Sequence, residues 1–297
     1  MKTATVMSPV RTRFENILYA TDFSAAAAHT IPFVKKFARH FNSKLVALHV
    51  RPPVLVAGRL TGDWAVDIEA TETMDENHRE ELLKAFAGIE TEVIIKSGDI
   101  QSDLSKAIET HYTDLVIIGT RGRTGLAKVL LGSVAEEIFR TVPCPVLTVG
   151  PHANESKANV REILFATDFA SDSQAAAAYA VSLAQEFQAR LALLHVVPEP
   201  KPGELVSWYD VQESSKKLLH NLVPKEAETW CKAECFVERG DPAERILNLA
   251  NLREVDLIVL GAQPESGVPG AATHLPVATA HKVVVHANCP VLTVRNR

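Results

Sequence analysis

An internal repeat limits the folds that this chain of 297 residues can adopt. Three blocks occur twice in the same order, at 17–23, 97–120 and 144–149 and again at 163–169, 239–262 and 289–294. The first block reads ILYATDF and then ILFATDF, and the third reads CPVLTV in both copies. Matched blocks in one order indicate two copies of a unit of roughly 140 residues, which is a domain rather than a solenoid repeat.

A polar stretch separates the two copies. Residues 150–159 read GPHANESKAN, and a cluster of Gly, Pro, Asn and Ser is typical of a linker. We therefore expect one domain over 1–150 and a second, similar domain over 151–297.

Each copy alternates two kinds of segment. Runs such as LVALHV and DLVIIG are apolar almost throughout, as in strands buried on both faces of a parallel sheet. Between such runs, 26–41, 103–111 and 133–140 carry apolar residues at helical spacing. This alternation predicts α/β domains, each an open parallel sheet of five strands with helices on both faces.

Charge and composition exclude several classes of protein. The net charge of −5 argues against broad nucleic-acid binding, which relies on neutralising phosphates. The chain has neither a run of about 18 apolar residues nor a secretory signal pattern, so we expect no membrane span and no export. Four cysteines do not make a disulfide framework, and a cytoplasmic globular protein is the expectation.

The residues that follow the strands are the candidates for a site, because ligands of open α/β sheets bind beyond the carboxyl ends of the strands. The first strand is followed by Thr21-Asp22-Phe23-Ser24 and an alanine-rich helix start. Asp22 or Ser24 could simply cap that helix by accepting its free N–H groups. The turn alone does not distinguish a cap from a ligand contact.

The fourth strand is followed by GTRGRTGLAKVLLGS, in which glycines bracket two arginines. Glycine lets a backbone approach a phosphate closely, and Ser133 falls at a helix start, where free N–H groups favour an anion. An ordinary flexible turn is the alternative, but this position and the two arginines favour phosphate binding. Neither the P-loop nor the dinucleotide-binding fingerprint fits the spacing.

These motifs together resemble the universal stress protein family. ATDFS follows the first strand, LHV ends the second, and G-x2-G-x9-G-S runs from Gly119 to Ser133 before CPVLTV. The likeness covers both copies, so the chain resembles a tandem member of that family. The resemblance implies a Rossmann-like, adenine nucleotide alpha hydrolase-like fold in each half, with ATP bound as adenine against the first two strands and phosphates on the glycine loop.

The resemblance also implies which residues of the first copy bind the nucleotide. They are Asp22, Leu45 and Ile118 beside adenine, Gly119 and Gly122 in the loop that closes over ribose and phosphates, and Gly132, Ser133 and Val134 as phosphate ligands. Arg121 and Arg123 are added as phosphate neighbours from their charge alone. Mg²⁺, held mainly by phosphate oxygens and water, is implied with ATP.

The second copy departs from this pattern. Asp168, Leu191 and the pair Leu260-Gly261 remain, but Pro264 stands where the second glycine belongs. Counting back from CPVLTV, Val277, Ala278 and Thr279 replace the Gly-Ser-Val of the first copy, and the loop arginines are missing. We therefore predict one competent nucleotide site, in the N-terminal half, and a degenerate site in the C-terminal half.

Cysteines and histidines suggest weaker alternatives. Cys231 and Cys235 share a face in either a helix or a strand, and with His220 they could hold a metal, although a fourth ligand is not evident. His274, His281 and His286 could serve a replacement site in the altered loop. His49 and His195, at equivalent strand ends, are interpreted as structural.

Three classes of function remain open at this point. The preferred one is a stress-response regulator in which ATP sets conformation or partner choice, because no nucleophile and base are evidently paired. A slow ATPase at the same loop and a nucleotide-independent scaffold are the alternatives. The family pairs domains through the final strand, which implies pairing of the two halves within this chain, and further association into a homodimer stays open.

Overall fold

The computed structural model describes residues 12–51, 68–120, 138, 142–200, 207–229, 231–261 and 277–295. The N-terminal half comprises β1 (Asn16–Ala20), α1 (Ala25–Phe41), β2 (Lys44–Arg51), α2 (Ile68–Ala85), β3 (Thr91–Ser97), α3 (Ile100–Thr110), β4 (Leu115–Gly119) and β5 (Val146–Val149). A short 3-10 helix, η1 (Glu155–Ala158), leads to the C-terminal half. That half comprises β6 (Glu162–Thr167), α5 (Ser171–Phe187), β7 (Arg190–Val197), α6 (Trp208–His220), the 3-10 helix η2 (Lys225–Thr229), β8 (Glu234–Arg239), α7 (Pro242–Leu252), β9 (Leu257–Gly261), α8 (Val277–His286) and β10 (Val291–Val294).

The two halves share one topology. The strands of the N-terminal half follow the order β3-β2-β1-β4-β5 and are parallel, and β8-β7-β6-β9-β10 repeat that order in the C-terminal half. The open parallel α/β fold expected from the sequence is thus confirmed in both halves.

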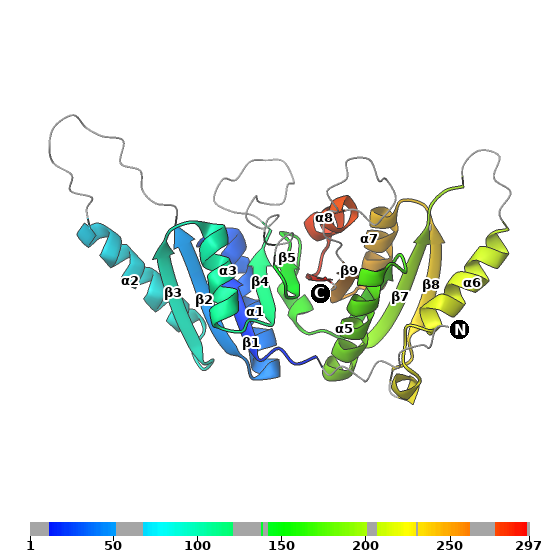
Figure 1. Ribbon diagram of the computed structural model, residues 1–297, viewed down its shortest axis with the longest axis horizontal. Helices are drawn as coiled ribbons and strands as arrows, with labels where there is room; N and C mark the ends of the chain where they lie inside the picture. The colour runs from blue at the N-terminus through cyan, green and yellow to red at the C-terminus, as the bar shows by residue number, and fades with distance from the viewer. Residues whose placement is uncertain are drawn as a thin grey trace.

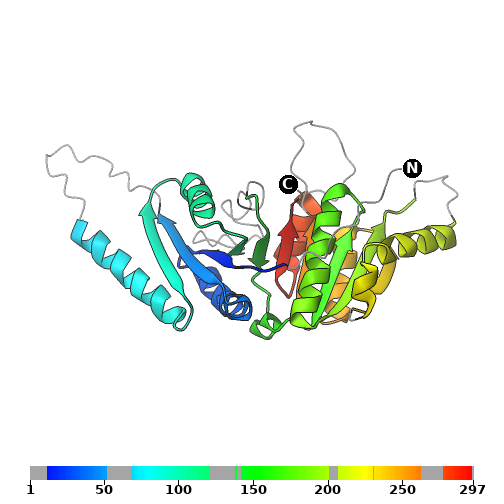
Figure 2. The same cartoon turned by 60° about the horizontal axis from the view of Figure 1, so that its bottom comes forward.

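The halves join into one continuous sheet. β5 and β10 pair antiparallel, with Leu147 opposite Leu292, so ten strands form a single sheet and not two separate sheets of five. Figure 1 shows the halves on either side of this seam, and Figure 2 shows the same arrangement from another angle. The pairing of the two final strands, which the family resemblance implied, is therefore present within the chain.

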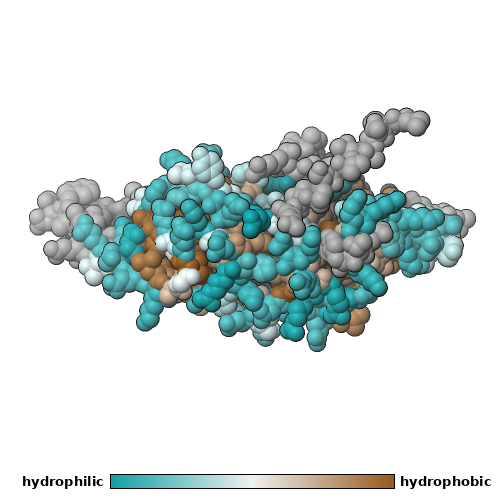
Figure 3. All heavy atoms as spheres, turned by 90° about the horizontal axis from the view of Figure 1, so that it is seen from below, coloured by the Kyte–Doolittle hydropathy of each residue, from teal (hydrophilic) through white to brown (hydrophobic). Residues whose placement is uncertain are grey.

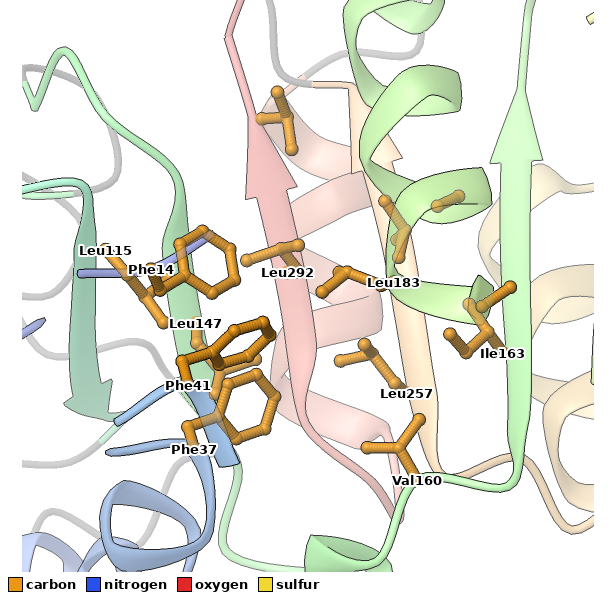
Figure 4. Close-up of a cluster of buried hydrophobic side chains, with 14 of the residues drawn as sticks. Phe14, Phe37, Phe41, Leu115, Leu147, Val160, Ile163, Leu183, Leu257 and Leu292 are labelled. Atoms are coloured by element: carbon orange, nitrogen blue, oxygen red, sulfur yellow. The ribbon is translucent and has the colours of Figure 1, made fainter. Parts of the chain in front are cut away.

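Each face of the sheet carries its own core. One cluster of buried residues packs beneath α1, α2, α5 and α6, and the other packs beneath α3, α7 and α8. The first cluster crosses the seam, where Phe14, Phe37 and Phe41 lie on the side of β5 and Leu257 and Leu292 lie on the side of β10 (Figure 4). Since this core contains residues of both halves, burial of apolar surface holds them together.

Two of the expected helices are found where the periodicity placed them. α1 begins one residue before the expected 26–41, and α3 covers most of the expected 103–111. The helix expected over 133–140 lies outside the described residues, apart from Ile138. No helix within the described part of the chain is long and apolar enough to cross a membrane.

Candidate functional site

The turn after β1 is built by its own side chains. The Asp22 carboxylate accepts a hydrogen bond from Ser24 N (3.0 Å), and the Ser24 hydroxyl accepts one from Ala27 N (3.1 Å). Phe23 has a positive φ of 58°, an uncommon conformation for a large side chain. The turn therefore caps α1 and at the same time holds the half-buried Asp22 at the carboxyl end of β1.

Gly119, the last residue of β4, lies against the first turns of α1. A Cβ at Gly119 would lie 3.0 Å from Ala26 O and 3.2 Å from Thr30 Oγ1, so a larger residue there would fit only if α1 moved slightly away from β4. The Tyr19 hydroxyl fixes the same helix start by donating to Ala27 O (2.7 Å), and burial raises the pKa of Tyr19 to about 12. Because β1 and β4 are adjacent strands, Asp22 and Gly119 share one edge of the sheet.

The two other residues expected beside adenine, Ile118 and Leu45, are both buried, and Leu45 lies at the edge of the sheet opposite the expected one. Ile118 precedes Gly119 in β4 and so lies near the same edge as Asp22. Its side chain packs in the core and is only 3% exposed. Leu45 lies at the amino end of β2, opposite Ile17 of β1, and is 1% exposed. The expectation that Leu45 borders a ligand beyond the carboxyl ends is therefore wrong, because that side chain fills the core near the opposite edge.

The proposed phosphate-binding residues lie outside the described part of the chain. They are Arg121, Gly122, Arg123, Gly132, Ser133 and Val134. Their roles stay predictions from the sequence. The next part of the motif that the structure describes is CPVLTV, whose first residue, Cys144, is buried just before β5.

An aromatic group lies beside the Asp22 turn and was not predicted. The rings of Phe23 and His78 of α2 stack with their centroids 3.8 Å apart, and the His49 ring meets Phe23 edge-on at 4.9 Å. His49 Nδ1 is 2.8 Å from Thr21 O, which supports its interpretation as a structural residue. α2 is thereby held over the carboxyl end of β2.

Several polar atoms near this end of the sheet are buried without a hydrogen-bond partner among the described residues. They include His78 Nδ1, Asp75 Oδ1 and Thr120 Oγ1. Arg51 Nη2 donates to Asp75 Oδ2 (3.0 Å), so the other carboxylate oxygen is the one without a partner. Because burying such groups is unfavourable unless they are paired, they are chemically suited to meet a polar ligand.

The equivalent edge of the C-terminal half uses its side chains differently. Asp168 Oδ1 accepts from Ala170 N (3.0 Å) and also from the Ser173 hydroxyl (2.8 Å), but neither is a free N–H group of α5, and Ala170 at the N-cap makes no side-chain cap bond. His195 Nδ1 is 2.8 Å from Thr167 O, and burial lowers the pKa of His195. Leu191, like Leu45, lies at the amino end of its strand. Pro264 and its neighbours lie outside the described residues.

The described residues do not support the cysteine metal site. All four cysteines are free thiols, and burial raises the pKa of Cys231, Cys235 and Cys289. Among the described residues, no three His, Cys, Asp or Glu side chains are grouped so that they could hold a metal ion. His274 lies outside that part of the chain.

Comparison with known proteins identifies the family. The model of the Universal stress protein family matches residues 13–150 and again 159–295. The chain belongs to the universal stress protein family. Two matches, one for each half, make it a tandem member.

Relatives that match nearly the whole chain and relatives that match one half of it support this assignment. A universal stress protein of Mycolicibacterium smegmatis is 25% identical over 298 residues, covering 95% of this chain and 97% of the relative. Universal stress protein YxiE of Bacillus subtilis is 35% identical over 150 residues, covering 45% of this chain and 98% of the relative. The crystal structure of a universal stress protein from Archaeoglobus fulgidus covers 96% of this chain and 98% of its own, with a TM-score of 0.70 and 21% identity, and so shares the fold.

Proposed function

We propose that this universal stress protein is a stress-response regulator that binds ATP at one site, in its N-terminal half. The observation that carries the proposal is the meeting of the Asp22 turn, the end of β4 and the start of α1 at one edge of the sheet. Gly119 opens the loop whose glycine pattern is intact, and a Cβ built on it would lie 3.0 Å from Ala26 O in the first turn of α1. Open α/β sheets bind ligands at such an edge.

The polar groups of this edge fit an adenine nucleotide. Asp22 Oδ1 is occupied by Ser24 N, and the half-buried carboxylate supplies a further acceptor for an amino or hydroxyl group. The buried Thr120 hydroxyl, which follows Gly119, has no partner among the described residues and could donate to ribose or phosphate. Gly132, Ser133 and Val134 would hold the phosphates through backbone N–H groups, with Arg121 and Arg123 nearby. Mg²⁺ would be held mainly by the phosphates and water.

The C-terminal half lacks this combination. Asp168 already accepts two hydrogen bonds from residues next to it in the chain, and the sequence after Gly261 has neither the second glycine nor the arginines. We therefore propose one ATP per chain. The chain also supplies its own domain pairing through β5 and β10, so a homodimer would use another surface. The free cysteines are in keeping with a cytoplasmic protein.

Calorimetric titration with ATP and Mg²⁺ tests the proposal. We expect about one site per chain in the parent and loss of binding in Gly122→Val, because a Cβ there would keep the backbone from the phosphates. Pro264→Val, at the equivalent position of the C-terminal half, is the matched control and should bind as the parent does. Two sites per chain, or equal losses in both variants, would contradict the proposal.

A further inference from the structure

A basic groove lies where the two halves meet, at the amino ends of the strands. It consists of two adjoining cavities of about 480 and 500 Å³ that share Lys36, His40 and Asn159. The last turns of α1 form one wall, and η1, the residues before β6 and the end of α5 form the other. This is the edge opposite the proposed nucleotide site, and Figure 3 shows that this underside is largely hydrophilic.

Four cationic side chains line the basic groove. Lys35, Lys36 and Arg39 come from α1, and Arg161 comes from the segment that enters β6. None of these four side chains forms an ion pair with any described residue, although Lys157 of η1 is paired with Asp256 at 3.0 Å. The acidic side chains nearby are Glu155 of η1 and Glu186 of α5, which leaves an excess of positive charge.

His40 gives the groove a fixed wall between the halves. Its ring stacks on Phe187 of α5 with centroids 4.3 Å apart and an interplanar angle of 25°. Burial lowers the pKa of His40, against the opposing effect of Glu186, so the ring is neutral near pH 7 and adds a hydrogen-bonding group rather than a charge. The stack holds α1 of one half against α5 of the other.

Helix stabilisation explains only part of this cluster. A cation in the last turn of a helix interacts favourably with the helix dipole, which accounts for Arg39. It does not account for Lys35 and Lys36 further up the helix, or for Arg161 of the other half, which lines the second cavity together with Lys36. Lys36 and Arg161 reach the second cavity from two separate elements, and an anion between them would relieve the repulsion that solvent only partly screens.

We propose that the basic groove binds a small anion that carries two or more phosphate groups. The volume of each cavity falls within the range of small-molecule sites. The open, charged lining suits a strongly hydrated polyanion better than an apolar ligand, and lysine and arginine are the usual phosphate partners. Because α1 and Arg161 belong to different halves, the bound anion bridges them. The phosphates could belong to free inorganic polyphosphate or to a nucleotide.

Titration calorimetry with sodium tripolyphosphate tests the groove on the full chain. In the Gly122→Val variant the proposed nucleotide site is removed. Binding of tripolyphosphate to this variant therefore reports on the groove alone and does not depend on the proposed function. We expect tripolyphosphate to bind this chain and the double change Lys36→Glu/Arg39→Glu to weaken binding at least about tenfold. Lys84→Glu/Lys106→Glu, which changes the net charge equally on α2 and α3, is the matched control and should change affinity by no more than about twofold.

The other outcomes are equally decisive. Lys36→Gln/Arg39→Gln keeps the groove surface without charge reversal and should give a smaller loss, with circular dichroism confirming that each variant is folded. ATP that competes with tripolyphosphate in the Gly122→Val background identifies nucleotide phosphates as ligands, and binding of tripolyphosphate alone identifies free polyphosphate. Absence of tripolyphosphate binding, or an equal loss in the groove and control variants, would overturn the proposal.

Discussion

Asp114 and Asp256 occupy equivalent positions in the two halves and accept equivalent hydrogen bonds, but they have different neighbours. The Asp114 carboxylate, just before β4, accepts from Glu15 N (2.7 Å) and Asn16 N (3.1 Å) and so ties β4 to the start of β1. Asp256 ties β9 to β6 in the same way through Arg161 N (2.8 Å) and Glu162 N (3.1 Å). Asp256 also has Lys157, whereas burial without a cation raises the pKa of Asp114 to about 6.

The raised pKa of Asp114 gives a pH prediction. Its usual value is 3.8, so the folded chain binds this proton at higher pH than the unfolded chain does. The associated stabilisation is present in full below about pH 4 and is lost as the pH rises through about 6. Asp114→Asn keeps an oxygen for both N–H groups but cannot titrate. Denaturation at pH 4.5 and 7 should therefore show a smaller loss of unfolding free energy in the variant than in the parent, and equal losses would refute the assignment.

Glu162 gives a prediction about a buried charge. It is 2% exposed, and its two oxygens lie 2.7 Å from Arg253 Nε and 2.6 Å from Arg190 Nε, the second contact without hydrogen-bond alignment. Because Arg190 is largely exposed, the pair energy is partly screened, and we expect Glu162→Gln to lower the unfolding free energy by about 2 kcal/mol. Urea denaturation measures it. Asn16→Ala, at the equivalent position of β1, should cost under about 0.5 kcal/mol.

At the scale of elements, α1 and α5 differ in their caps. Ser24 caps α1 through Ala27 N, whereas α5 begins after Ala170, which makes no side-chain cap bond. We expect Ser24→Ala to lower and Ala170→Ser to raise the unfolding free energy, each by about 1 kcal/mol. Thermal denaturation of the two variants provides a reciprocal test. An unchanged stability in Ala170→Ser would contradict this account of the missing cap.

The elements also show what the sequence could predict. α1 follows from its periodicity, since Phe33, Phe37 and Phe41 recur every fourth residue and all are buried. α2 was not among the helices predicted from the sequence, because much of its surface is charged and its buried contacts, Leu82 among them, come late in the helix. An amphipathic pattern that faces the core over a few residues leaves little periodic signal.

The site was predictable to a similar degree. Repeated motifs placed Asp22 and Gly119 at one edge, because parallel strands deliver their carboxyl ends together. Leu45 was assigned to that edge through the family resemblance, although its place near the start of a strand argues for the opposite edge. The stack of Phe23 on His78 joins residues far apart in sequence, and no local pattern encodes such a contact.

For the whole molecule, the seam decides whether the halves unfold together. Leu147 and Leu292 are opposite one another and fully buried, Phe37 and Phe187 meet across the halves at 5.5 Å, and Thr12 N donates to Ser182 Oγ (2.6 Å). A shared core makes partial unfolding of one half expose apolar surface of the other. We therefore expect the parent to unfold in one calorimetric transition whose van't Hoff and calorimetric enthalpies agree.

Removing the seam contact should separate the two halves. Leu147→Ala/Leu292→Ala leaves a cavity between β5 and β10, and large-to-small changes of this kind cost about 2–5 kcal/mol per site. Each half keeps most of its own core, so the weakened coupling should split the transition into two. Leu193→Ala, equally buried but in β7 away from the seam, is the matched control and should shift a single transition to lower temperature. If the seam variant still unfolds in one transition, the two halves are coupled by contacts other than the pairing of β5 with β10.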